Sequence, residues 1–131
     1  QFLVQENDDN KNLITGSLNQ GATDTYTITP EQGTRVKLTL VWTDLPGEWN
    51  PVPAVDRTDL KLVNDLDMRA VGITETQSPW ILDPANPANA ATKGDNFRDN
   101  VEKIEFDAVD ASYQVNITNK ATLADGPQQY A

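Results

Sequence analysis

Oxygen-bearing side chains gather in two short segments of this sequence. The first is Asn64-Asp65-Leu66-Asp67, and the second holds Asp95, Asn96, Asp99, Asn100 and Glu102. Asp44 adds a further carboxylate directly after a strand-like segment that ends at Trp42. Ca²⁺ takes about six to eight oxygen ligands in irregular geometry, so these segments could form a calcium site. The spacing does not match an EF-hand loop.

The same residues could instead have a purely structural role without a metal ion, and the sequence leaves both interpretations open. Asn and Asp in loops often hydrogen-bond neighbouring backbone groups, and outward carboxylates are often solvated or paired with arginine, here Arg57, Arg69 or Arg98. On a strand, Asp65 and Asp67 would lie roughly 6.5–7 Å apart, which loosely fits the acid pair of a glycosidase. Acidic residues are so frequent here that this match carries little weight, and we expect no catalytic residues.

Two tryptophans suggest a different kind of site. Trp49 and Trp80 lie in long segments that contain several prolines. Exposed aromatic rings on a β-sandwich can stack on sugars, as in a carbohydrate-binding module. Large apolar rings gain most from burial, so we expect both to fold onto the domain. Binding through Trp49 and Trp80 is the alternative.

Composition removes many other functions. The chain has 131 residues, 10 basic against 20 acidic side chains, and neither histidine nor cysteine. These absences exclude a Ser-His-Asp triad, a thiol nucleophile, a disulfide and an ordinary zinc site. A net charge of −10 argues against nucleic-acid and anionic-membrane partners. The length suits one domain, and we expect residues 1–131 to be a single domain excised from a larger protein.

Alternation of apolar and polar residues predicts the elements that position these groups. In residues 35–42 the apolar side chains are Val36, Leu38, Leu40 and Trp42, which should face a core. The same pattern predicts strands at 25–29, 66–70, 102–106 and 113–118. Weaker candidates are 2–5, 13–18 and a last strand that begins near Gln129.

Turn residues and two long connections join these strands. The connections span about 44–58 and 72–99, and loops of this length usually carry function or cover something. Seven or eight short strands with long crossovers predict an all-β fold, an antiparallel two-sheet β-sandwich of jelly-roll type.

Several strings, taken in order, resemble one family. They are 38–47 (LTLVWTDLPG), 62–68 (LVNDLDM), 79–84 (PWILDP), 95–96 (DN), 100–102 (NVE), 113–117 (YQVNI) and 126–131 (GPQQYA). The series resembles the C-terminal β-sandwich domain of secreted bacterial subtilisin-like serine proteases, which is similar to the P-domain of proprotein convertases. It covers about residues 34–131.

The resemblance implies a secreted, extracellular accessory domain without catalytic residues. Its partner would be the catalytic domain of the same protease, a serine endopeptidase, with protein substrate as a possible second partner. Such domains often bind calcium as a structural ion. The positions that match a metal site are Asp44, Asn64, Asp65, Asp67, Asp95, Asn100 and Glu102. A spacer with neither metal nor ligand is a third hypothesis.

Overall fold

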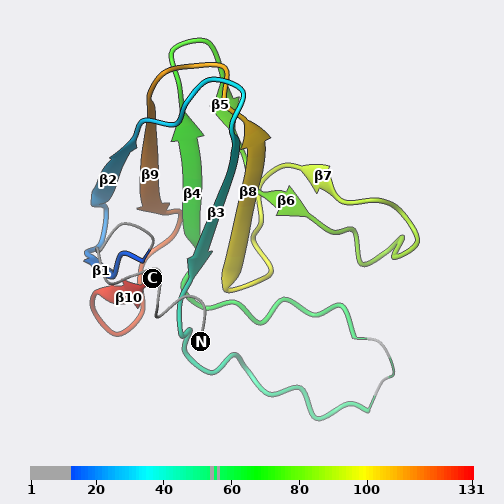
Figure 1. Cartoon of the computed structure of the whole chain (residues 1–131). Helices are drawn as coiled ribbons and strands as arrows, with labels where there is room; N and C mark the ends of the chain where they lie inside the picture. Colours follow the sequence, from blue (N-terminus) through cyan, green and yellow to red (C-terminus); the bar gives the residue numbers. More distant parts are fainter. Residues whose placement is uncertain (1–12, 54, 56) are drawn as a thin grey trace.

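The computed structural model describes residues 13–53, 55 and 57–131, and within these ranges all regular secondary structure is β-strand (Figure 1). The predicted strand at 2–5 lies outside the described residues. The strands are β1 (Gly16–Leu18), β2 (Thr23–Ile28), β3 (Arg35–Val41), β4 (Leu66–Val71), β5 (Thr76–Gln77), β6 (Trp80–Ile81), β7 (Thr92–Lys93), β8 (Val101–Asp107), β9 (Tyr113–Asn119) and β10 (Gln128–Tyr130).

Eight of the ten strands form two layers, β6 and β7 form a separate pair, and every described strand pair is antiparallel. One layer has the order β2-β9-β4-β5, with β9 paired along its length to both β2 and β4. The other contains β3 paired with β8, and β1 paired with β10. A bridge between Trp42 and Tyr130 joins β10 to the end of β3. The predicted all-β, antiparallel β-sandwich is confirmed, whereas the jelly-roll topology stays a prediction.

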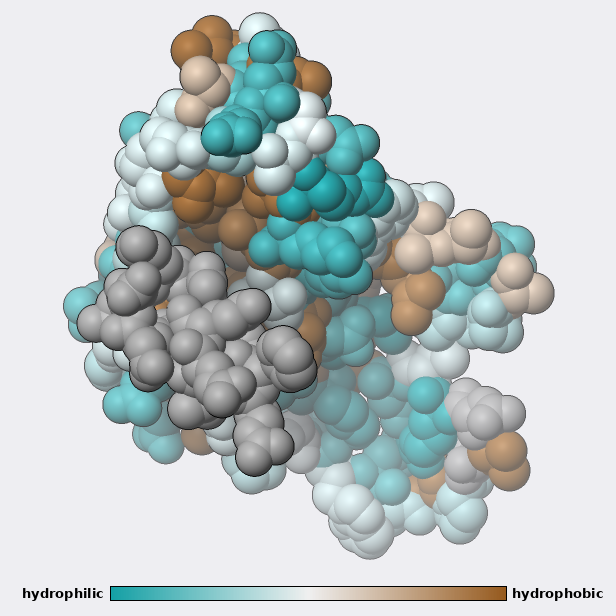
Figure 2. Space-filling model, viewed as in Figure 1, coloured by the Kyte–Doolittle hydropathy of each residue, from teal (hydrophilic) through white to brown (hydrophobic). Residues whose placement is uncertain are grey.

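The alternating residues supply the core between the layers. Val36, Leu40 and Trp42 are buried as expected, and Leu38 is only half-buried. Beside Leu38 the surface is hollowed and lined by hydrophobic side chains (Figure 2). The rest of the buried apolar cluster consists of Leu18, Leu66, Met68, Ala70, Ile104, Phe106, Ala108, Tyr113, Val115, Ile117, Leu123 and Tyr130. Burying each large side chain contributes roughly 1.5–3 kcal/mol, so this cluster drives folding.

Tyr130 ties the two layers together. Its hydroxyl donates a hydrogen bond to Asp24 Oδ2 at 2.6 Å and lies 2.6 Å from the Tyr26 hydroxyl. Its ring occupies the space that a Cβ on Gly16 would need. Glycine at this position therefore lets β1 pair with β10 beneath the tyrosine ring.

The two long connections differ in their content. The described residues of the first connection, 43–53, 55 and 57–65, form no strand. The stretch between β4 and β8 holds the short strands β5, β6 and β7. Strands of two residues are too short for alternation to reveal, so the sequence prediction missed all three. The described part of the chain contains no helix long and apolar enough to cross a bilayer.

Candidate functional site

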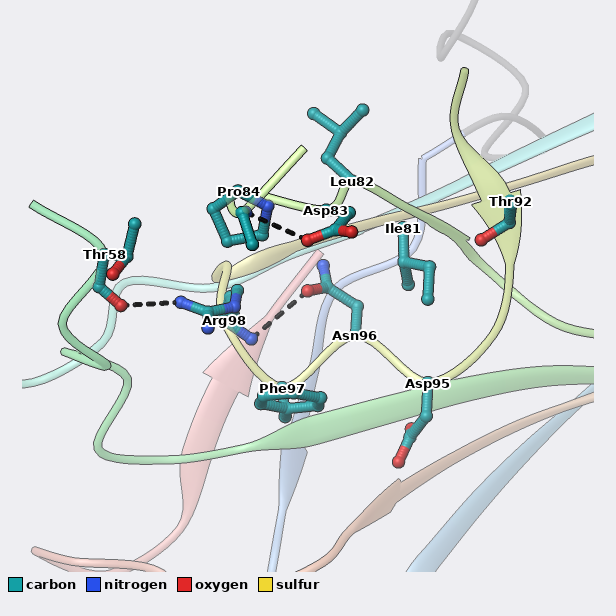
Figure 3. Close-up of a pocket in the computed structure, with 11 residues that line it drawn as sticks. Thr58, Ile81, Leu82, Asp83, Pro84, Thr92, Asp95, Asn96, Phe97 and Arg98 are labelled. Atoms are coloured by element: carbon teal, nitrogen blue, oxygen red, sulfur yellow. Dashed lines mark hydrogen bonds between the residues drawn. The ribbon is translucent and has the colours of Figure 1, made fainter. Parts of the chain in front are cut away.

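A pocket of about 460 Å³ lies where the two long connections meet (Figure 3). Arg98 spans it, since its Nη1 donates to the Thr58 carbonyl oxygen at 2.9 Å. Of the two carboxylates that line it, Asp83 accepts hydrogen bonds from Ala85 N and Asn86 Nδ2, and Asp95 forms ion pairs. Both carboxylates therefore already have partners within the chain, and these contacts stabilise the loops around the pocket.

Three of the seven predicted metal ligands hold loops in place. Asp44 accepts hydrogen bonds from the backbone N–H groups of Val63 (2.6 Å) and Asn64 (2.8 Å). Asn64 is buried, and its side-chain amide bonds Ala124 twice and Gln128 once. Asn100 Nδ2 donates to the Trp42 carbonyl oxygen at 2.7 Å. These contacts match the structural interpretation, because each side chain satisfies backbone or buried polar groups.

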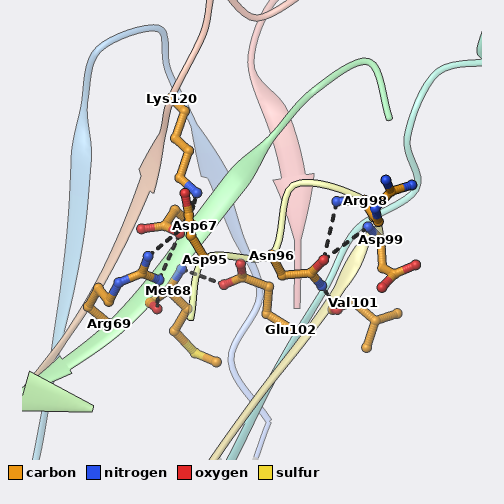
Figure 4. A network of polar contacts seen from close by, with 10 residues as sticks. All are labelled: Asp67, Met68, Arg69, Asp95, Asn96, Arg98, Asp99, Val101, Glu102 and Lys120. Atoms are coloured by element: carbon orange, nitrogen blue, oxygen red, sulfur yellow. Dashed lines mark hydrogen bonds and ion pairs between the residues drawn. The ribbon is translucent and has the colours of Figure 1, made fainter. Parts of the chain in front are cut away.

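The other four predicted ligands lie together beside the start of β4, and we call them the acidic cluster: Asp65, Asp67, Asp95 and Glu102 (Figure 4). Asp65 directly precedes β4 and Asp67 lies within it, whereas Asp95 comes from the loop after β7 and Glu102 from β8. The cluster thus joins both layers of the sandwich. Sequence separation alone would not place Asp95 and Glu102 next to β4.

Glu102 is the most unusual member of the cluster. It is fully buried, at an inward position of β8 opposite Leu40. Its Oε2 accepts a hydrogen bond from the Met68 backbone N–H at 2.6 Å, whereas Oε1 has no hydrogen-bond partner. The pKa of Glu102 is raised to about 8, chiefly by burial and in smaller part by the charges of Asp67 and Asp65. The Met68 hydrogen bond and the charge of Arg69 act in the opposite direction. A fully buried carboxylate oxygen without a partner is costly in an apolar core.

Two cations balance the rest of the cluster. Arg69 Nη1 lies 2.7 Å from Asp67 Oδ1, and Arg69 Nη2 lies 2.9 Å from Asp95 Oδ1. Lys120 Nζ lies 3.0 Å from the same oxygen of Asp67 and also pairs with Asp95. Asp65 Oδ1 is buried without a hydrogen-bond partner, and burial raises the pKa of its carboxyl. With all four acids ionised, the cluster and its two cations would carry a net charge of −2.

The carboxylates converge on Arg69 and Lys120 rather than around an open position. Accordingly, no group of three acidic side chains in the described ranges has the arrangement of a metal site. The donor chemistry nevertheless fits a hard cation, because Asp65 and Glu102 keep buried oxygen atoms that no proton donor reaches. Arg69 and Lys120 occupy the region in which such a cation would neutralise the same charges.

Sequence analysis named Arg69 as a possible ion-pair partner but missed Lys120 and the role of Asn96. The β4–β9 register, which pairs Asp67 with Thr118, puts Lys120 opposite Asp65, and Lys120 N donates to the Asp65 carbonyl oxygen. Asn96 Oδ1 accepts hydrogen bonds from two backbone N–H groups of the loop before β8. The register could have identified Lys120 if the pairing of the two strands had been known.

The two tryptophans, both expected to fold onto the domain, differ in exposure. The Trp49 side chain is 84% exposed, so the prediction of a buried ring is wrong for it. Trp80, in β6, is 38% exposed, and Lys93 Nζ lies 4.5 Å from the centroid of its ring. Trp49 is thus open to solvent, whereas Trp80 is partly covered.

Comparison with known proteins adds no assignment: no protein-family model and no curated protein matches the chain.

Proposed function

We propose that this chain is a non-catalytic accessory domain of a secreted subtilisin-like serine protease, and that its acidic cluster binds Ca²⁺. The β-sandwich fold and the ordered strings that resemble this family support the first part. The observation that carries the second is the buried, unpartnered Oε1 of Glu102 beside three further carboxylates. In this role the domain packs against the catalytic domain and makes it more rigid.

The contacts narrow the proposed ligands to four of the seven predicted residues. Asp65, Asp67, Asp95 and Glu102 would hold the ion, because each has a carboxylate oxygen that is either without a hydrogen-bond partner or paired with a cationic side chain. Asp44, Asn64 and Asn100 are excluded from this set because their polar atoms hold loops. When bound, Ca²⁺ supplies positive charge that lets the buried acids ionise without mutual repulsion.

Calorimetric melting in EDTA and then in excess CaCl₂ tests the calcium proposal. A ligand that binds only the folded state stabilises it by mass action, about 4 kcal/mol at a thousandfold excess over Kd. We expect Ca²⁺ to raise the Tm of the chain, and Glu102→Gln to abolish this shift while the protein stays folded. Asp107→Asn, an exposed carboxylate outside the cluster, serves as the matched control and should keep the full shift. An unchanged Tm in both solutions would refute the calcium site.

The accessory role has its own test. The purified chain should not hydrolyse casein, because we assign it no catalytic residue, and adding it to the separately expressed catalytic domain should raise that enzyme's Tm. Casein hydrolysis abolished by a serine-protease inhibitor would contradict the proposal. So would a protein-coding region, adjoining this one, that encodes a glycosidase instead of a subtilisin-like catalytic domain.

The exposure of Trp49 favours a second candidate, a carbohydrate- or surface-binding module. An indole that is 84% exposed contributes little to folding, so Trp49→Ala should leave the free energy of unfolding within about 0.5 kcal/mol. If this candidate is correct, the substitution removes binding on a glycan array, and Trp80→Ala, which removes a partly covered ring, weakens it less. Glycan binding that survives Trp49→Ala, or no binding by the unmodified chain, would eliminate this candidate.

A further inference from the structure

Among the described residues, most of β3 has no strand partner on one of its two edges. β3 pairs with β8 over its whole length, from Arg35 opposite Asp107 to Val41 opposite Val101. On the other edge, Val41 exchanges two backbone hydrogen bonds of 2.9 Å with Ala131, just after β10. No other strand of the described chain pairs with that edge.

Hydrogen-bond alternation shows which groups the free edge presents. Trp42 N donates to the Asn100 carbonyl oxygen on the β8 side, whereas the N–H and C=O of Val41 point to Ala131. Because the direction alternates along an antiparallel strand, Thr39 and Lys37 point their N–H and C=O groups the same way as Val41. No backbone hydrogen bond joins these groups to another residue of the described ranges.

An apolar groove lies directly beneath this edge. Its volume is about 190 Å³, and it is visible as the hydrophobic hollow in Figure 2. Side chains from both layers line it, including Leu38 and Leu40 from β3, Tyr26 and Ile28 from β2, and Val115 from β9. Leu38, Tyr26 and Ile28 are only half-buried although they face inward. The groove therefore exposes core-facing side chains beside backbone groups of β3 that have no partner among the described residues.

The register between Val41 and Ala131 determines which residues of an added strand would lie opposite each residue of β3. Ala131 lies opposite Val41, so a strand in line with β10 would run antiparallel to β3 past Leu40, Thr39, Leu38 and Lys37. Its residues opposite Leu40 and Leu38 would enter the groove, and those opposite Thr39 and Lys37 would point outward.

Charge favours acidic residues at the outward positions. The outward side of β3 and β8 carries Arg35, Lys37 and Lys103, and Lys93 reaches it from β7. Glu105 and Asp107 are the acids that pair with cations on this side. This gives a local excess of positive charge on a chain whose net charge is −10.

We propose that the free edge of β3 and the groove beneath it bind an extended strand of a partner protein, in which apolar residues alternate with acidic ones. The strand adds to the sheet antiparallel to β3 and in line with β10. Backbone hydrogen bonds to Thr39 and Lys37 provide affinity, and the groove and Lys37 provide selectivity. No member of the acidic cluster lines the groove, although Leu40, which does, lies opposite Glu102 in the β3–β8 pair. The proposal does not depend on bound calcium.

Titration of the full chain with a synthetic peptide tests the proposal. The peptide Val-Thr-Ile-Glu-Val-Glu places its apolar residues opposite Leu40, Leu38 and Val36. In amide NMR spectra we expect the Thr39 and Lys37 signals to shift and their hydrogen exchange to slow. N-methylation of the peptide's Thr and first Glu removes the donors that face β3, and it should weaken binding by about tenfold or more.

A charge swap provides the matched protein control. Lys37→Glu changes an exposed side chain, so the fold should be retained; it should weaken binding of the acidic peptide and favour Val-Thr-Ile-Lys-Val-Lys. Three results would overturn the proposal. They are an unchanged Thr39 amide with excess peptide, binding that appears only after removal of residues 1–12, and a concentration-dependent dimer that protects the same amides without peptide.

Discussion

Glu102 occupies an inward position of the strand pattern of β8, where an apolar side chain would be expected. It follows the same inward alternation as Ile104 and Phe106, yet it brings a carboxyl group into the core. The Met68 backbone N–H supplies one hydrogen bond, and the second oxygen is left without one. Such a group costs stability whenever it is ionised, unless a cation offsets its charge.

The raised pKa of Glu102 predicts an unusual pH dependence in the absence of calcium. The folded-state pKa is about 8 and the ordinary value is 4.5, so between these pH values the folded chain binds a proton that the unfolded chain releases. The contribution to stability is complete below pH 4.5 and is lost as pH rises toward 8, by an amount on the order of a few kcal/mol. Urea unfolding in EDTA at several pH values measures it.

Glu102→Gln cannot ionise, and it should remove this part of the pH dependence. Glu105→Gln is the control, because that half-buried carboxyl has a lowered pKa through hydrogen bonds from Arg35 and Lys103 and does not titrate in this range. If Glu102→Gln keeps the same loss of stability between pH 4.5 and 8, another group is responsible.

The acids of the candidate site could be located from the sequence, but their partners could not. Asp65 and Asp67 flank Leu66, and alternation alone places them on the side of β4 opposite Leu66 and Met68. Lys120 reaches them only through the β4–β9 register, which no local pattern encodes. Asp44 and Asn64 were predicted as ligands by residue type. Only the structure shows that their side-chain oxygen atoms already accept hydrogen bonds from backbone N–H groups.

At the level of elements, the long strands were predictable and the two-residue strands were not. β3, β8 and β9 each have seven residues, enough for alternation to define an inward face. β5, β6 and β7 have two residues each, and they form because neighbouring segments offer backbone partners. Trp49 was misplaced for a related reason, since no pattern shows whether a proline-containing loop reaches the sandwich.

The pairing of β1 with β10 depends on the absence of a side chain at Gly16. A Cβ there would overlap the ring of Tyr130, which also bonds Asp24 and contacts Tyr26. We expect Gly16→Ala to displace Tyr130 and lower the free energy of unfolding by about 1–3 kcal/mol. Chemical denaturation measures the loss, and near-ultraviolet circular dichroism reports the changed tyrosine environment.

Ser17→Ala is the matched control, because Ser17 is an exposed neighbour in the same strand. It should leave both measurements nearly unchanged. Equal losses for the two substitutions would show that β1 tolerates alanine poorly in general and that the tyrosine contact is not the cause.

Over the whole molecule, the charge is strongly unbalanced. Twenty acidic and ten basic side chains give a net charge of −10, so like charges repel across the compact fold. Because salt shortens the range of this repulsion to about 10 Å at 0.1 M, we expect the Tm to rise as NaCl is added in EDTA. A Tm that falls with NaCl would mean that the ion pairs of Arg69, Lys120 and Arg35 outweigh the general repulsion.

The adjacency of Gly16 and Tyr130 also determines how the molecule would respond to tension. These residues face one another in an antiparallel pair, and Ala131 bonds Val41 directly beside them. Gly16 begins β1 and Tyr130 ends β10, so a force that pulls these two residues apart acts at one end of the pair. It therefore breaks the hydrogen bonds between β1 and β10 one after another rather than all together. Such a ladder unzips, so the outermost bonds would part first and under little load, while the β3–β8 and β4–β9 ladders remain intact.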